Sequence, residues 1–173
     1  IKSTLKINKN FFNYAKKLRV IARAGTGLDN IDLKEAKKRG IKIFSVPKGN
    51  TVAAAEYIIS LIFLMIKKLL LISEMVKKND FSRHKITLRQ LDSMKIGIVG
   101  IGNLGIELSK RLQSFGCKLI GFDPYSNKIN SFQEYGGIST LNLNFLLKQC
   151  DIIILAANLT SQSEYMININ NIN

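Results

Sequence analysis

The stretch that decides the fold is KIGIVGIGNLG, residues 95–105. An apolar run typical of a buried strand leads into the pattern G-x-G-x-x-G, formed by Gly100, Gly102 and Gly105, and an amphipathic segment follows to residue 115. A strand before the glycines and a helix after them is the context in which this pattern binds a dinucleotide. We expect Gly100 to permit the tight turn, Gly102 to admit a pyrophosphate, and Gly105 to let the helix pack closely. The helix start then offers N–H groups to the phosphates.

An acidic residue follows at the end of the next apolar run, 118–122, where Asp123 precedes Pro124 and Tyr125. At this place a carboxylate accepts hydrogen bonds from the ribose hydroxyls of NAD and repels the additional phosphate of NADP. The sequence therefore predicts NAD as the cofactor. A structural α/β turn without a ligand is the alternative.

Strand and helix signals alternate along the chain, which indicates an α/β fold. An apolar run at 18–22 leads into a glycine-rich turn, and Asp32 with Glu35 is typical of a helix start. Gly40 is expected to end that helix, before a strand at 41–46. The later elements expected are strands at 96–99, 118–122 and 152–156, helices at 103–115 and near 142–149, and an irregular stretch between 123 and 141.

Residues 51–76 form the longest helical stretch, with hardly any polar face. Their uninterrupted apolar run, 57–66, is well short of the roughly 18 residues that cross a membrane. We therefore expect no membrane insertion. A helix that is apolar all round predicts burial in a core or in a subunit interface, and we expect a homodimer or a higher homo-oligomer.

The net charge of +14 raises the possibility of nucleic-acid binding. The lysines, however, are spread in pairs along the chain without interleaved aromatic residues. We interpret them as solvated faces and expect no nucleic-acid partner. Cys117 and Cys150 are interpreted as structural thiols in a reducing cytoplasm, and the single histidine, His84, gives no cluster for a metal.

Four segments, taken in order, resemble the D-2-hydroxyacid dehydrogenase family, most closely its phosphoglycerate dehydrogenases. They are RAGTGLDNID at 23–32, PKGNT at 47–51 with Ala55 and Glu56, the stretch 94–125, and LT at 159–160 through MIN at 166–168. The resemblance implies two α/β domains with NAD and substrate between them. Residues 1–49 are similar to the later part of a flavodoxin-like substrate domain. Residues 50–173 are similar to the Rossmann-type NAD-binding domain, a doubly wound parallel sheet, incomplete because it is cut after its fourth strand.

The resemblance also implies roles for the cofactor-binding residues. Asn103 and Leu104 are expected to offer backbone N–H groups to the pyrophosphate, Asp123 to bind the ribose, and Thr26 to lie beside the nicotinamide.

The substrate-binding residues implied by the resemblance lie earlier. Backbone amides of Thr26 and Gly27 are expected to meet the substrate carboxylate. Arg23 and Arg83 are candidates for a substrate phosphate, although a solvated charge is as good an interpretation of Arg83.

The chain departs from the family pattern at several positions. Ala-Ala-Asn at 156–158 stands where the family has a His-x-Pro type sequence, and Leu88 and Ser93 replace glycines. The family's catalytic Arg, Glu and His are expected beyond Asn173, and His84 does not align with that His. No catalytic residue is therefore assigned in this chain.

The function implied is NAD-dependent oxidation of a D-2-hydroxy acid, with 3-phosphoglycerate the leading substrate and serine biosynthesis the leading pathway. A hydroxypyruvate or glyoxylate reductase, or another D-2-hydroxyacid dehydrogenase, is the alternative within the class. An NAD-sensing, corepressor-like binding module is the alternative from another class. The glycine loop at 23–30 favours the enzyme, since a sensor needs no carboxylate site.

Overall fold

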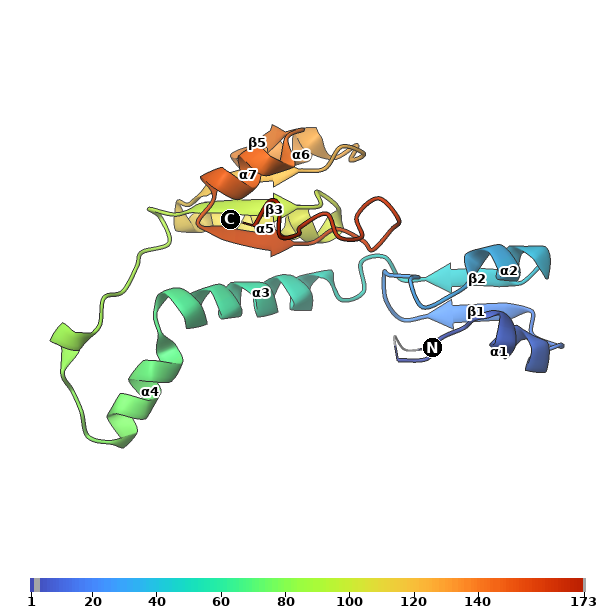
Figure 1. Ribbon diagram of the computed structural model, residues 1–173, viewed down its shortest axis with the longest axis horizontal. Helices are drawn as coiled ribbons and strands as arrows, with labels where there is room; N and C mark the ends of the chain where they lie inside the picture. The colour runs from blue at the N-terminus through green and yellow to red at the C-terminus, as the bar shows by residue number, and fades with distance from the viewer. Residues whose placement is uncertain (2–3, 173) are drawn as a thin grey trace. The chain divides into compact units, whose positions relative to one another are not determined.

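The computed structural model describes residue 1 and residues 4–172 (Figure 1). It divides into two compact units. The first comprises Ile1–Val52 and Asn158–Met166, and the second comprises Ala53–Ala157 and Ile167–Asn173. The assignment of residues 1–49 to a substrate domain stays a prediction.

The first unit contains a pair of parallel strands and two short helices. Strand β1 (Val20–Arg23) pairs with β2 (Lys42–Ser45), and the helices are α1 (Lys9–Tyr14) and α2 (Leu33–Lys38). The predicted start of α2 is confirmed, because Asp32 Oδ1 accepts a hydrogen bond from Glu35 N at 2.9 Å. Its predicted end is confirmed too, since Gly40 follows in the left-handed region at φ +67°. The core of this unit consists of Ile7, Phe12, Ile21, Ile31, Ala36 and Ile41.

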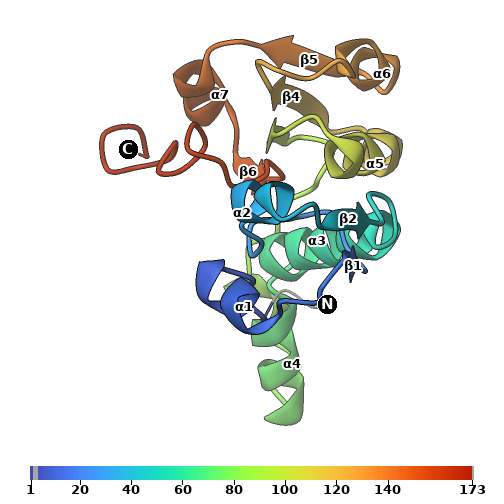
Figure 2. The ribbon, with the colours of Figure 1, turned by 90° about the vertical axis from the view of Figure 1, so that its right-hand side faces the viewer.

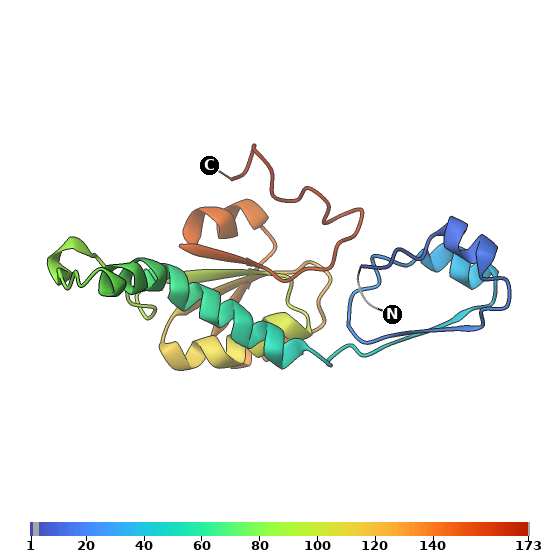
Figure 3. The same ribbon diagram turned by 90° about the horizontal axis from the view of Figure 1, so that it is seen from below.

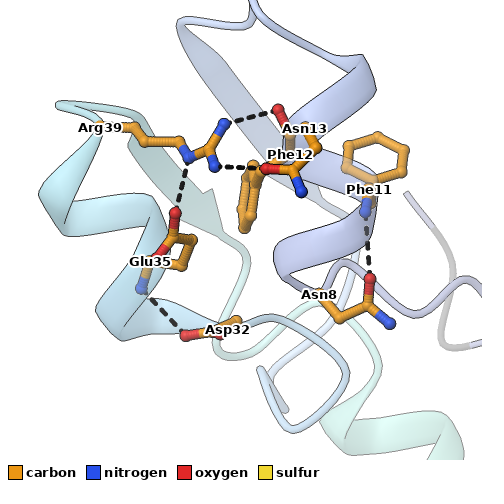
Figure 4. Close-up of polar contacts among 7 residues, drawn as sticks. All are labelled: Asn8, Phe11, Phe12, Asn13, Asp32, Glu35 and Arg39. Atoms are coloured by element: carbon orange, nitrogen blue, oxygen red, sulfur yellow. Dashed lines mark hydrogen bonds and ion pairs between the residues drawn. The ribbon is translucent and has the colours of Figure 1, made fainter.

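Arg39 joins α1 to α2 (Figure 4). Its guanidinium pairs with Glu35 at 2.8 Å and donates to the Phe12 carbonyl at 2.6 Å and to Asn13 Oδ1 at 2.9 Å. The same group lies over the Phe12 ring, 5.6 Å from its centroid. One planar cation thus satisfies the exposed carbonyl end of α1 and covers the largest side chain of the core.

The second unit is built on a parallel sheet with strand order β5-β4-β3-β6. The strands are β3 (Lys95–Val99), β4 (Lys118–Phe122), β5 (Gly137–Thr140) and β6 (Ile152–Leu155). Helices α5 (Asn103–Leu112) and α6 (Ile129–Glu134) cover one face, and α7 (Leu143–Gln149) covers the other (Figures 2 and 3). A short 3-10 turn, Gln113–Phe115, continues α5. Helices on both faces of a parallel sheet confirm the predicted doubly wound α/β fold.

The interpretation of residues 123–141 as irregular was wrong, because this stretch contains α6 and β5. Both elements depend on Phe132, which is fully buried. A Cβ added at Gly137 would lie 2.3 Å from the Phe132 ring, and one at Gly121 would lie 2.7 Å from it. The glycines that weaken the strand signal are therefore what lets this ring pack on the sheet.

The prediction of a single helix over residues 51–76 was also wrong in detail. It is divided into α3 (Thr51–Ile66) and α4 (Leu69–Lys77), with Lys68 between them in the left-handed region at φ 47°. Ala55, Ile62 and Ile66 of α3 join the core of the second unit, as predicted. Helix α4 is different, since it contributes no buried residue and its Leu70 is 67% exposed. No helix in the described part of the chain is long and apolar enough to span a bilayer.

A connector follows α4 and contains a short 3-10 turn at Arg83–Lys85. It is fastened to the sheet through Arg89, whose NH2 lies 2.6 Å from Asp151 Oδ1. The other oxygen of Asp151 accepts a hydrogen bond from Lys95 N at 2.9 Å. These two bonds hold the pKa of Asp151 below its ordinary value, the bond from Lys95 N contributing most. The ion pair thereby fixes the chain where it enters β3.

Candidate cofactor site

The turn between β3 and α5 has two positions where protein packing alone requires glycine. Gly100 adopts φ +101°, and a Cβ there would lie 2.5 Å from Ala157 N. A Cβ on Gly105 would lie 2.4 Å from the Gly100 carbonyl oxygen. The start of α5 therefore lies directly against the turn, and the segment after β6 lies against its other side.

Gly102 is different, because a Cβ there would meet no protein atom within 4 Å among the described residues. Its φ of −86° is also one that any residue adopts. Neither packing nor backbone strain thus explains a glycine here. Open space over this residue fits a ligand that approaches the backbone closely.

Helix α5 begins without a side-chain cap within the described part of the chain, because Gly102 occupies the N-cap position. Asn8, Asp32 and Asn142 cap α1, α2 and α7 with a side-chain oxygen, whereas α4 and α6, like α5, begin without one among the described residues. An uncapped helix start combines N–H donors with the positive end of the helix dipole. This arrangement fits a pyrophosphate at the first turn of α5.

Asp123, at the end of β4, reaches the same turn. Its Oδ2 accepts a hydrogen bond from Ile101 N at 2.9 Å, and its Oδ1 accepts one from Tyr125 N at 3.0 Å. The carboxylate is thus fixed beside the glycines, at the carboxyl end of the sheet where ligands of parallel α/β folds bind.

Two residues that the sequence reasoning missed hold the loop after β4 against the turn. Ser126 Oγ donates to the Ile101 carbonyl at 2.7 Å, and the ammonium of Lys128 contacts Asn103 Oδ1. The available signal was only that these polar residues closely follow Asp123 in the sequence.

The departure from the family pattern at 156–158 lies next to the same turn. Ala156 N donates to the Val99 carbonyl at 2.7 Å, which continues the β6–β3 pairing by one residue. The backbone of this segment lies against Gly100, since Ala157 N is 2.5 Å from the position of a Cβ on that glycine.

The first unit contains a separate pocket of about 300 Å³ beside the glycine loop, lined by Arg23, Gly25, Thr26, Gly27 and Asn50 among others. Thr26 Oγ1 donates to the Pro47 carbonyl at 2.9 Å, which ties the loop to the end of β2. The guanidinium of Arg23 lies under the loop, with its NH2 3.8 Å from the position of a Cβ on Gly27. Its NH1 is buried and has no hydrogen-bond partner among the described residues.

The remaining candidates lie elsewhere. Arg83 is exposed at the start of the 3-10 turn and belongs to the second unit, whereas Arg23 belongs to the first. Its role stays a prediction. Burial raises the pKa of the Cys117 thiol, and burial with the charge of Asp151 raises that of Cys150 to about 11. Both are free thiols, and no group of potential metal ligands occurs in the described residues.

Comparison with known proteins identifies the class. The family described as D-isomer specific 2-hydroxyacid dehydrogenase, NAD binding domain, matches residues 59–173. The human D-3-phosphoglycerate dehydrogenase is 33% identical over 170 residues, covering 98% of this chain and 32% of the relative. A hydroxypyruvate reductase of Thermotoga maritima is 31% identical over 168 residues, covering 97% of this chain and 53% of the relative.

Comparison with solved structures points to the same family. A D-lactate dehydrogenase from Aquifex aeolicus, crystallised with NAD and lactic acid, has a TM-score of 0.87 and 30% identity. The alignment covers 94% of this chain and 48% of that one. The chain thus spans about a third of the phosphoglycerate dehydrogenases it matches and about half of the lactate dehydrogenase.

The chain belongs to the D-isomer specific 2-hydroxyacid dehydrogenases and carries their NAD-binding domain. The expected fold, family and cofactor are thereby confirmed.

Proposed function

We propose that the protein containing this chain oxidises a D-2-hydroxy acid with NAD, and that its substrate is 3-phosphoglycerate, which becomes 3-phosphohydroxypyruvate in serine biosynthesis. The observation that carries the choice of substrate is Arg23, whose buried NH1 has no hydrogen-bond partner in the part of the chain that the structure describes. Leaving a buried charged donor unpaired is costly, and an anionic ligand removes that cost.

A substrate with two anionic groups suits this pocket better than one with a single group. The backbone amides of Thr26 and Gly27 are proposed to bind the carboxylate, in the manner of an anion nest. A phosphate then pairs with Arg23, whose planar guanidinium binds phosphate oxygens in pairs. Lactate or glyoxylate carries only the carboxylate and leaves Arg23 unpaired.

The cofactor site supports the oxidoreductase function. We propose that the N–H groups of Asn103 and Leu104 bind the pyrophosphate over Gly102. Asp123 is proposed to accept hydrogen bonds from the ribose hydroxyls, and Thr26 to lie beside the nicotinamide. When bound, NAD accepts the hydride from C2 of the substrate. The proton acceptor and the cation that polarises the reacting oxygen are proposed to come from outside these 173 residues.

The test is steady-state kinetics of the full-length protein with 3-phosphoglycerate and D-lactate. Arg23→Met is expected to raise the KM for 3-phosphoglycerate by about tenfold or more, as for a lost charged hydrogen bond, and to leave D-lactate turnover unchanged. Arg19→Met, at an exposed position beside β1, is the matched control.

Equal losses with both substrates would reject Arg23 as the phosphate ligand. Preferred turnover of hydroxypyruvate or glyoxylate would instead favour the reductase function, which the relative from Thermotoga maritima supports. Tight NAD binding without turnover of any acid would favour the NAD-sensing module.

We also propose a cytoplasmic homodimer. Tyr57 and Met65 of α3 and Leu70 of α4 are 66%, 58% and 67% exposed, and a subunit interface would cover them. The cytoplasmic location is proposed because Cys117 and Cys150 are both free thiols.

A further inference from the structure

The loop after β4 presents a cation to the glycine turn. Ser126 Oγ accepts a hydrogen bond from Lys128 N at 3.0 Å and donates to the Ile101 carbonyl at 2.7 Å. The Lys128 side chain is partly buried, and its ammonium contacts Asn103 Oδ1. The backbone and the side chain of Lys128 are thus both fixed, and its charge lies at the first residue of α5.

We propose that Lys128 binds the cofactor through the pyrophosphate. This inference rests on the proposed cofactor site, in which the pyrophosphate lies at the start of α5. The helix offers only partial charges there, whereas an ammonium offers a full one. Lysine has three N–H donors, so the contact with Asn103 leaves donors for phosphate oxygens.

The position of Lys128 favours the pyrophosphate over the 2′-phosphate of NADP. Asp123, the proposed ribose ligand, is bonded to Ile101, before Gly102 in the turn. Lys128 contacts Asn103, after Gly102 and at the helix start. A cation that binds a 2′-phosphate should lie beside the carboxylate of Asp123, whereas one that binds the pyrophosphate should lie at the helix start.

The experiment measures dissociation constants of the full-length protein. Those of NADH and NADPH come from fluorescence titrations, and that of adenosine comes from its displacement of bound NADH. Lys128→Met removes the charge and keeps most of the side-chain length. It is expected to raise the Kd of NADH about three- to tenfold, as for a partly exposed charged contact, and to raise that of NADPH by the same factor. Adenosine, which lacks the pyrophosphate, should bind unchanged, and the salt dependence of NADH binding should fall.

Two further variants serve as controls. Lys128→Arg keeps the charge and should bind NADH within about twofold of the native protein, since a guanidinium also binds phosphate. Lys118→Met removes an exposed lysine from the start of β4, at the amino end of the parallel strands and thus away from the turn, and should leave the Kd of NADH unchanged.

Three results would overturn the inference: an unchanged Kd for NADH in Lys128→Met, a loss confined to NADPH, or an equal loss for adenosine, which would indicate a structural role. The variant Gly102→Ala distinguishes a failure of the role proposed for Lys128 from a failure of the proposed cofactor site. A methyl group there meets no described protein atom within 4 Å, yet it would occupy the proposed pyrophosphate space. If Gly102→Ala weakens NADH binding and Lys128→Met does not, only the role of Lys128 fails. If neither does, the proposed cofactor site fails with it.

Discussion

Replacing Gly105 by alanine should destabilise the second unit, although alanine is the better helix former. The added Cβ would lie 2.4 Å from the Gly100 carbonyl oxygen, well inside the 3.0 Å that such atoms essentially never undercut. The obstacle is backbone and cannot rotate away, so α5 must move off the turn. Overpacking of this kind costs about 1–3 kcal/mol, against a gain of about 1 kcal/mol in helix propensity. We expect a net loss of up to about 2 kcal/mol in the free energy of unfolding.

The assay is urea denaturation followed by circular dichroism, with Gly102→Ala as the matched control three residues earlier. Gly102 has space for a methyl group, and its loss as an N-cap glycine should cost less than about 1 kcal/mol. Gly105→Ala should therefore lose stability, while Gly102→Ala should lose mainly cofactor affinity. A Gly105→Ala protein as stable as the native one, or less affected than Gly102→Ala, would refute the packing argument.

Four further predictions follow from the site and the fold. Asp123→Ala should relax the expected preference for NAD over NADP, because it removes both the proposed ribose ligand and a negative charge; a native protein that prefers NADP in turnover assays would remove Asp123 from the site. The lowered pKa of Asp151 means that its hydrogen bond from Lys95 N and its ion pair with Arg89 stabilise the fold above about pH 4, and that this stabilisation is lost as the pH falls further; Arg89→Met, which removes only the ion pair, should partly flatten the acid limb of a Tm-against-pH curve. Leu70→Glu should shift a dimer toward monomers in sedimentation velocity, and a native protein that is monomeric at micromolar concentration would count against the interface. The 173-residue chain alone should form no NADH from 3-phosphoglycerate, because no catalytic residue is assigned in it and the resemblance gives its single histidine no catalytic role; turnover near that of an intact dehydrogenase would show that the catalytic residues were misassigned.

The parts of the fold that could be predicted from sequence depend on neighbours in the chain. The strand, glycine turn and helix at 95–112 follow from hydrophobic period and backbone freedom, and the start of α2 follows from one hydrogen bond between Asp32 and Glu35. Strand β5 was missed because its position depends on Phe132 packing over Gly121 and Gly137. That contact is tertiary and leaves no periodic signal.

The break between α3 and α4 was missed for a similar reason. Neither glycine nor proline marks it, and Lys68 adopts a left-handed conformation that its type does not favour. Lys67, beside the break, donates to the Arg89 carbonyl of the connector at 2.9 Å, a partner that is distant in sequence. The candidate site shows the same division: a local motif gave the glycines and Asp123, whereas the contact of Lys128 with Asn103 required the folded loop.

The missing side-chain cap of α5 has a thermodynamic consequence. Helices α1, α2 and α7 carry their own side-chain oxygen acceptors, whereas α4 and α6 begin without one in the described part of the chain, and α5 has glycine at the N-cap position. A pyrophosphate bound there completes the helix as a removable cap, so ligand occupancy and folding stability become linked quantities. Cofactor at a hundred times its Kd stabilises a folded domain by about 2.7 kcal/mol. The melting temperature of this domain should therefore report the concentration of NAD around it, and the domain should unfold most readily when that concentration falls.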